Sequence, residues 1–268
     1  MLRTRVITAL VIAVVLFPAV FFLNQALWAY LTALIIGVAA WEFARLGGFC
    51  PAGRIRFGAS IAALTVLLAV FLPADLFAQA STLSLGLSVL FWIGVIPFWL
   101  RARRKLQSHL AFALVGVIVL VPTWFALIDL WTRGALWLIA AIGLVALADI
   151  AAYFFGRAFG RRKLAPNISP GKSWEGAWGA MFTVTVFVLL LDSWMQGWNS
   201  SRAIVIILFM PLLTLVSIAG DLFESMLKRQ AGVKDSSNLL PGHGGVLDRI
   251  DSHTAALPLI ALLLRVIH

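Results

Sequence analysis

Charged residues are scarce in this chain of 268 residues. They make up only 12% of it, and just 11 of them are acidic. A water-soluble domain averages about 25% charged and about 45–50% apolar residues. Here apolar residues reach 62%, and the mean hydropathy is +1.00. A soluble core cannot absorb that much apolar sequence. The composition therefore excludes an ordinary soluble domain and predicts a chain embedded in a bilayer.

Cysteine and histidine are also scarce, and this limits the metal chemistry available. The single cysteine, Cys50, can form neither an intramolecular disulfide nor a multi-cysteine metal site. A zinc site is disfavoured because it would want more His or Cys, and the acidic stretch Asp221–Ser252 discussed below contains only His243. Basic residues are in surplus, 21 against 11 acidic, for a net charge of +10. They are scattered through short loops, so we expect cytoplasmic loops and anionic lipid or phosphate ligands rather than nucleic acid.

Apolar runs divide the chain into nine predicted spans of about 20 residues each. The N-terminal run resembles a signal peptide, but it is too long and no cleavage site followed by a hydrophilic region is present, so we expect a retained first span. The ninth segment is short, at about 14 residues. The segments are Val6–Leu23, Ala26–Leu46, Phe57–Leu76, Leu83–Leu100, Leu110–Ile128, Ala135–Phe155, Trp178–Trp194, Ala203–Phe223 and Thr254–Ile267.

The fold class predicted from these segments is an all-α, polytopic integral membrane protein with about nine transmembrane helices. Residues 1–134 would carry helices one to five, for packing and possible homodimer contacts. Residues 135–268 would carry helices six to nine, with catalytic loops at 156–177 and 224–253. These two loops are the longest predicted on the cytoplasmic side, so the chemistry is expected there.

The distribution of Lys and Arg predicts the orientation. With the N-terminus in the cytoplasm, 18 basic residues fall in inside loops and 3 outside, which supports this orientation and places the C-terminus outside. The outside residues are Arg133, Arg202 and Arg265. The inside residues are Arg3, Arg5, Arg45, Arg54, Arg56, Arg101, Arg103, Arg104, Lys105, Arg157, Arg161, Arg162, Lys163, Lys172, Lys228, Arg229, Lys234 and Arg249.

The end of the sixth segment combines a packing motif with a buried acid. Ala148, Ala152, Gly156 and Gly160 recur every four residues, a row of small side chains that lets another helix pack closely. Asp149 lies inside the same apolar helix. It could serve as the partner of a stray arginine, but we favour a functional site facing a polar cavity, because ionisable groups are costly in this setting.

The loop APNISPGKSWEGAWG invites comparison with a Walker A motif. That motif fails here, because Pro166 stands where the first glycine is needed and no strand is expected before the loop. What remains is a glycine-rich turn carrying Lys172 and the Ser173 hydroxyl. Backbone N–H groups and a lysine suit phosphate oxygens, and a plain solvated loop is the alternative.

The stretch from Asp221 to Ser252 holds five of the eleven acidic residues and four of the 21 basic ones. Asp221, Glu224 and Lys228 fall on one helical face, and Asp248 and Asp251 are again three apart. Carboxylate oxygens of this kind suit Mg²⁺, which typically takes one or two carboxylates plus substrate phosphates. A juxtamembrane salt-bridge cluster is the simpler alternative to a metal-plus-polyphosphate site.

The same stretch resembles a known signature. Ser225-x-x-Lys228-Arg229, then Lys234-Asp235, then Pro241-x-His243-Gly244-Gly245-x-x-Asp248-Arg249-x-Asp251 is similar to the phosphatidate cytidylyltransferase (CDP-diacylglycerol synthase) family motif. SPGKSWEG and the helix end from Asp149 to Gly156 extend the resemblance. The first 130 residues add only hydrophobicity to it.

This resemblance implies that CTP and phosphatidic acid react to give CDP-diacylglycerol and pyrophosphate. It also implies an all-helical membrane fold, often dimeric, in a bacterial inner membrane with the active site on the cytoplasmic face, and Mg²⁺ with or without a second, monovalent cation. The implied metal ligands are Asp221, Asp248 and Asp251; the catalytic residues Asp221, Asp248, Lys228 and Arg249; and the substrate-binding residues Lys172, Ser173, Arg229, Lys234, Asp235, His243, Gly244, Gly245 and Asp149.

Other functions remain open on the residues alone. An ion-coupled transporter could use Asp149, Asp221 and Asp248 as a pathway, although it would not explain the bases and glycines of the second loop. A CTP-dependent lipid kinase would transfer the γ-phosphate instead, and a scaffold protein would carry no chemistry. Glu42 and Arg45, at the end of the second span, could touch the site or only pair with each other.

Overall fold

The computed structural model describes the backbone of residues 2–267 and, within that range, every side chain except those of Leu2, Arg3, Arg5 and Ile267. The predicted cytoplasmic positions of the Arg3 and Arg5 side chains therefore lie outside the described residues. The α4 helix continues through a π-helical segment, Phe91–Val95, into α5, so the described chain forms nine helical rods. Its elements are α1 Leu2–Phe22, α2 Gln25–Leu46, α3 Pro51–Phe71, α4 Ala74–Leu90, α5 Ile96–Ala102, α6 His109–Thr132, α7 Ala135–Phe159, β1 Lys163–Ala165, β2 Ser169–Ser173, α8 Trp174–Gln196, α9 Ser200–Gln230 and α10 Leu247–Ile267.

Seven of these rods are long and apolar enough to cross a membrane. The apolar part of α1, Val6–Phe22, is shorter, and α10 opens with charged residues. The all-α, polytopic membrane fold predicted from the sequence is therefore confirmed. The small antiparallel hairpin of β1 and β2 is an addition to it, and it includes the GKS residues that were expected to form a turn.

The predicted bounds of one helix and of one loop were wrong. The third segment was expected at 57–76, but α3 begins at Pro51 and ends at Phe71, and Pro73 directly precedes α4. Proline suits the first turn of a helix and interrupts a helix interior, so the two prolines mark the true ends. The expected loop at 224–253 is only the segment 231–246, because α9 runs on to Gln230 and α10 begins at Leu247.

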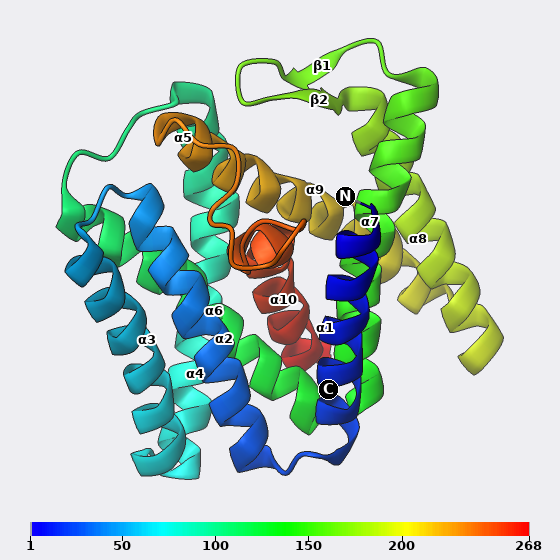
Figure 1. The fold of residues 1–268 in the computed structure, drawn as a ribbon. Helices are drawn as coiled ribbons and strands as arrows, with labels where there is room; N and C mark the ends of the chain where they lie inside the picture. The colour runs from blue at the N-terminus through cyan, green and yellow to red at the C-terminus, as the bar shows by residue number, and fades with distance from the viewer. Residues whose placement is uncertain (1, 268) are drawn as a thin grey trace.

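The α10 helix runs through the middle of the bundle. It packs against α9 and α7 on one side and against α6, α4 and α2 on the other. Figure 1 shows the N-terminus near the end where α10 begins and the C-terminus towards the opposite end. Thr8 of α1 donates a hydrogen bond to the Pro241 carbonyl at 2.9 Å, which ties the first helix to the 231–246 loop.

The row of small residues on α7 packs against α8, as predicted. A Cβ added at Gly176 of α8 would lie 2.6 Å from the Ala152 carbonyl oxygen and 3.2 Å from the Gly156 Cα. The two helices therefore approach closely enough for backbone to touch backbone. This contact places the start of α8, and the hairpin before it, beside the end of α7.

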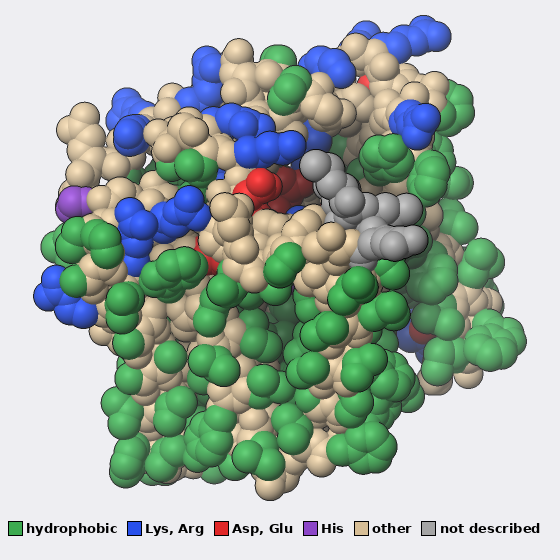
Figure 2. All heavy atoms as spheres, in the orientation of Figure 1, with side chains coloured by type: hydrophobic (Ala, Val, Ile, Leu, Met, Phe, Trp, Pro, Cys, Tyr) green, Lys and Arg blue, Asp and Glu red, His purple; other side chains and the backbone are tan. Residues whose placement is uncertain are grey.

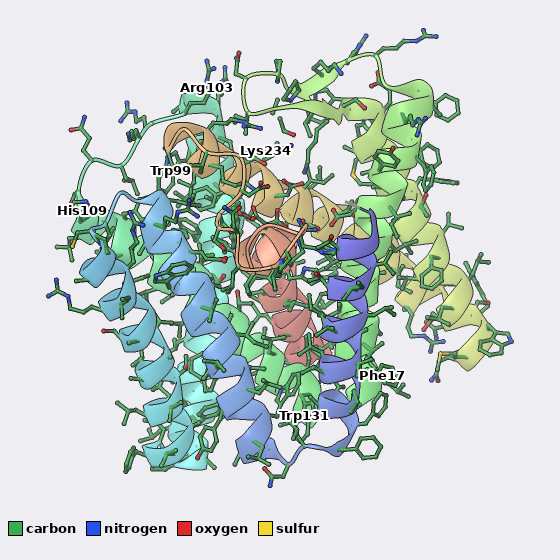
Figure 3. The ribbon with its side chains drawn as sticks, in the orientation of Figure 1. Phe17, Trp99, Arg103, His109, Trp131 and Lys234 are labelled. Carbon is green, nitrogen blue, oxygen red and sulfur yellow. The ribbon has the colours of Figure 1, made fainter. Side chains whose placement is uncertain are left out.

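Basic side chains gather at one end of the molecule. In Figure 2 Lys and Arg cover the end that carries the hairpin and the 231–246 loop, acidic side chains show among them, and apolar side chains cover the remaining length of that face. Figure 3 places Arg103 and Lys234 at the basic end and Trp131 towards the other. This separation agrees with the asymmetry of basic residues in the sequence.

Candidate active site

An acidic cavity of about 490 Å³ lies between the ends of α7, α9 and α10, beside the hairpin and the start of α8. Because α7, α9 and α10 each contribute carboxylates, residues far apart in the sequence meet here. Lys172 and Ser173 of β2 line the same cavity. Its four aspartates are Asp149, Asp221, Asp248 and Asp251, all of which were candidates from the sequence.

Asp221 is the acid most directly held by a base. The Lys172 Nζ lies 2.6 Å from Asp221 Oδ2, and the Ser225 hydroxyl donates to Asp221 Oδ1 at 3.1 Å. Asp221 and Lys172 are each between a fifth and a third exposed, so both remain accessible from the cavity. The lysine thus bridges the hairpin and α9 across the cavity.

The hairpin is held by its own helix. The Glu175 carboxylate, in the first turn of α8, accepts hydrogen bonds from the backbone N–H groups of Arg161 and Arg162 at 3.0 and 3.1 Å. Ser173 caps α8, its hydroxyl oxygen accepting from the Gly176 N–H at 3.2 Å. Ser173 also lines the acidic cavity. These contacts direct Lys172 towards Asp221.

Asp248 lies at the start of α10, ahead of the predicted ninth span, and both its oxygens are engaged. Lys228 donates to Oδ1 at 2.7 Å, and Oδ2 accepts from the Ser236 N–H and hydroxyl, both at 2.9 Å, and from the Gly245 N–H at 2.7 Å. Burial raises the pKa of Asp248, but these donors outweigh it and lower the pKa to about 2. Asp248 is therefore ionised at neutral pH, and it ties the loop to Lys228.

Acids outnumber bases around the acidic cavity. Lys228 Nζ also lies 3.2 Å from Glu224 Oε1, and Glu224 is buried. Four aspartates line the cavity and Glu224 lies beside them, but the ion pairs with these five acids come from only two lysines among the residues described, Lys172 and Lys228. Uncompensated carboxylates in a poorly solvated place call for added positive charge, and hard oxygen donors suit Mg²⁺. The donor set therefore fits a divalent cation.

The geometry also limits how such an ion would be held. Among residues 2–267, no group of three or more His, Cys, Asp or Glu stands ready to surround a metal. Mg²⁺ needs no closed protein cage, since it keeps waters and takes one or two carboxylates plus substrate phosphates. The site thus fits an ion that arrives with a polyphosphate.

A second cavity, of about 690 Å³, is enclosed by the 231–246 loop and is here called the loop cavity. Its wall is polar and carries the bases Lys234 and Arg249, together with His243 and Asp235. Lys234 and Arg249 are exposed, and the part of the chain described shows no carboxylate paired with either. They are therefore available to an anionic ligand.

The PGHGG sequence builds the wall of the loop cavity. The His243 N–H donates to the Leu240 carbonyl at 2.8 Å, with Pro241 second and Gly242, at φ +76°, third in the turn, as in a type II turn. Gly244 has φ +83°, and a Cβ there would lie 2.6 Å from Asp248 Oδ2. Only glycine therefore allows the loop to lie against that carboxylate.

The remaining predicted residues fall into two groups. Gly245 is buried and acts through its N–H on Asp248. Arg229, in the last turn of α9, is exposed and lines neither the acidic cavity nor the loop cavity. The structure thus brings all the predicted side chains except Arg229 to one of the two cavities or into contact with residues that line them. Asp248, which lines the acidic cavity, also binds the 231–246 loop.

Sequence reasoning left some contributors unassigned. Glu42 and Arg45 of α2 do not pair with each other, because both bind the 231–246 loop instead. Arg157, counted only as a cytoplasmic base, lines the acidic cavity with Tyr153. Its guanidinium donates to the Tyr153 hydroxyl at 3.2 Å. Glu42 could have been predicted as a contributor to the site, because it is an acidic residue inside an apolar helix.

Comparison with known proteins shows which family the chain resembles over its whole length. A model of the cytidylyltransferase family matches residues 3–267. A phosphatidate cytidylyltransferase of Pseudomonas aeruginosa is 42% identical over 275 residues, which cover 98% of this chain and 97% of that protein. A phosphatidate cytidylyltransferase of Haemophilus influenzae is 35% identical, with 96% of each chain covered. One from Staphylococcus saprophyticus is 29% identical, with 98% and 99% covered.

Proposed function

Because the chain belongs to the cytidylyltransferase family, we propose that it transfers the cytidylyl group of CTP to phosphatidic acid, giving CDP-diacylglycerol and pyrophosphate for phospholipid synthesis. The observation that carries this proposal is the pairing of an acidic cavity lined by Asp248 with a basic loop cavity whose loop donates to that carboxylate through the Gly245 N–H. Two polyanionic substrates need both cations and a place for metal, and this arrangement supplies them.

The substrate that each cavity would bind is proposed from the basic side chains that line it. Lys234, His243 and Arg249 line the loop cavity and would hold the phosphates of CTP. Arg157 and Lys172 line the acidic cavity, beside apolar residues of α7 and α8, and would hold the lipid phosphate. The lipid head group would thus enter from the membrane side and the nucleotide from the aqueous side.

The reaction needs positioning more than proton transfer. An oxygen of the lipid phosphate attacks the α-phosphorus of CTP, the new P–O bond forms, and the bond to the bridging oxygen of pyrophosphate breaks. The attacking phosphate is already anionic near neutral pH, so no strong general base is required. Lysine and arginine side chains would bring the two polyanions together and hold the pyrophosphate as it leaves.

Mg²⁺ is part of the proposal, and Asp221, Asp251 and Asp248 are its proposed ligands at the acidic cavity. Asp221 and Asp251 are the first choice, because Asp248 already accepts four hydrogen bonds. The ion would neutralise phosphate charge. A monovalent cation could share the remaining carboxylates.

The proposed setting is a bacterial inner membrane, with both cavities on the cytoplasmic face. The chain is an integral membrane protein with several apolar helices and bacterial relatives. The basic end in Figure 2 supports the orientation, because Lys and Arg concentrate in cytoplasmic loops. A homodimer formed through residues 1–134 belongs to the same proposal.

A labelling experiment tests the reaction. Purified protein with Mg²⁺ and phosphatidic acid should transfer label to lipid from α-labelled CTP and none from γ-labelled CTP. Label entering lipid only from the γ-position would identify a lipid kinase instead. Ion flux in vesicles, with no labelled lipid from any substrate, would identify a transporter.

A further inference from the structure

Glu42 is a buried acid with an unusual set of partners. It lies in α2, fully shielded from solvent, and no ion pair reaches it from the residues described. Its carboxylate instead accepts three hydrogen bonds and shares a fourth donor, the Ser236 hydroxyl, with Asp248. The donors are the Ser237 hydroxyl at 2.5 Å, the Leu247 N–H at 2.6 Å, and the Val246 N–H and Ser236 hydroxyl, each at 3.1 Å.

These donors come from two separate parts of the chain. Ser236 and Ser237 lie within the 231–246 loop, while Val246 ends the loop and Leu247 begins α10. One carboxylate therefore closes the loop and also accepts from the amides at the start of a helix, where negative charge is favourable. Burying a carboxylate that has no ion-pair partner costs free energy. A buried carboxylate whose oxygens are satisfied by several directed hydrogen bonds favours one conformation of the loop that supplies the donors.

Neighbouring contacts leave the loop little alternative. Arg45, one turn further along α2, donates to the Ser236 carbonyl at 2.7 Å. A Cβ at Gly245 would collide with Glu42 Oε1 and the Ser236 hydroxyl. The Ser236 hydroxyl also reaches Asp248 Oδ2 at 2.9 Å, so Glu42 and the site acid share a partner.

We propose that Glu42 is a positioning residue for CTP: it holds the 231–246 loop so that Lys234, His243 and Arg249 line the loop cavity. Glu42 lines neither cavity and touches no substrate in this scheme. It acts through Ser236, Ser237 and the start of α10. The inference rests on the proposed function, because it assigns nucleotide phosphates to the loop cavity.

The test is the variant Glu42→Gln, in which an amide NH₂ replaces one accepting oxygen and faces a donor. Loss of one such charge-assisted bond corresponds to an increase of about 10-fold in KM for CTP. The kcat and the KM for phosphatidic acid should stay close to wild type. Hydrogen–deuterium exchange should show faster exchange at the amides of residues 235–246 and no change in α3.

Two further variants distinguish a positioning role of Glu42 from a general effect on stability. Thr32→Val alters another buried polar residue of α2, whose hydroxyl bonds only within its own helix, and should leave the KM for CTP unchanged. Ser237→Ala should raise the KM for CTP less than Glu42→Gln. Combining the two should add little to the Glu42→Gln effect, because the hydroxyl and carboxylate are one contact.

The outcomes distinguish the proposals. Unchanged KM for CTP and unchanged loop exchange in Glu42→Gln would overturn the positioning role. A fall in kcat matching the unfolded fraction, with loop exchange unaltered, would also overturn it. If wild-type protein makes no CDP-lipid, the proposed function fails, while the effect of Glu42→Gln on loop exchange still decides whether the carboxylate shapes the loop.

Discussion

Two clusters of charge stand at opposite ends of the bundle, and they are built differently. At the end remote from the hairpin, Asp129 of α6 is met by Arg133 at 3.0 Å and by Arg265 of α10 at 2.7 Å. Arg265 also donates to the Thr82 and Ser81 hydroxyls of α4, at 2.5 and 2.8 Å. Here two bases serve one acid. Around the acidic cavity, two lysines serve five acids.

The difference separates a structural cluster from a functional one. In the Asp129 cluster the one acid is paired with two arginines, and Arg265 ties α10 to α4 and α6, so no carboxylate there lacks a base. The acidic cavity keeps more carboxylates than the two lysines paired with them, and an added cation can balance this excess. The ratio of basic to acidic side chains therefore separates the two clusters. An excess of acids, as in the acidic cavity, indicates a site for a cationic ligand, whereas a cluster of charges alone does not.

The largest effect is expected from Asp221→Asn in the acidic cavity. Activity should fall by roughly 100- to 1,000-fold, because the variant removes both a charge for metal and the partner of Lys172. Steady-state assays in detergent would measure it. Asp192→Asn is the matched control, since Asp192 pairs only with Arg202, 3.1 Å away, and lines neither cavity. An equal loss of activity in Asp221→Asn and Asp192→Asn would contradict the functional role assigned to the acidic cavity.

A smaller effect is expected from Lys234→Ala in the loop cavity. Removing one phosphate-binding cation should raise the KM for CTP by about 10-fold and leave the KM for phosphatidic acid unchanged. Lys163→Ala provides the control, because Lys163 is equally exposed but lies on the hairpin outside that cavity. A higher KM for the lipid alone would exchange the roles assigned to the two cavities.

The smallest effect on activity is expected from Arg265→Ala, at the other cluster. Its loss leaves Asp129 with one base and unties α10 from α4, so the free energy of unfolding should fall by about 1–3 kcal/mol. Thermal unfolding in detergent would measure the loss. Activity per folded molecule should remain at the wild-type level, and a selective loss of activity at unchanged stability would show that this cluster is functional.

The fold and most of the candidate site could be predicted from the sequence because their signals are local. Apolar runs and the uneven distribution of Lys and Arg predicted a polytopic helical protein. The spacing of Asp221, Glu224 and Lys228 predicted a shared helical face, and α9 carries all three. Segment ends were less accurate, since hydropathy does not detect that Pro51 starts a helix or that α10 begins before its apolar run.

The Asp221–Ser252 stretch, with its signature motif, was determined by the sequence itself, because composition and short-range spacing carry that information. Only the tertiary structure decided that its residues divide between an acidic cavity and a loop cavity, and that Glu42 of α2 binds the loop. Glu42 and Ser237 are 195 residues apart, and no periodic pattern links such positions. Their contact depends on how α2, α9 and α10 pack, which is set by the whole core.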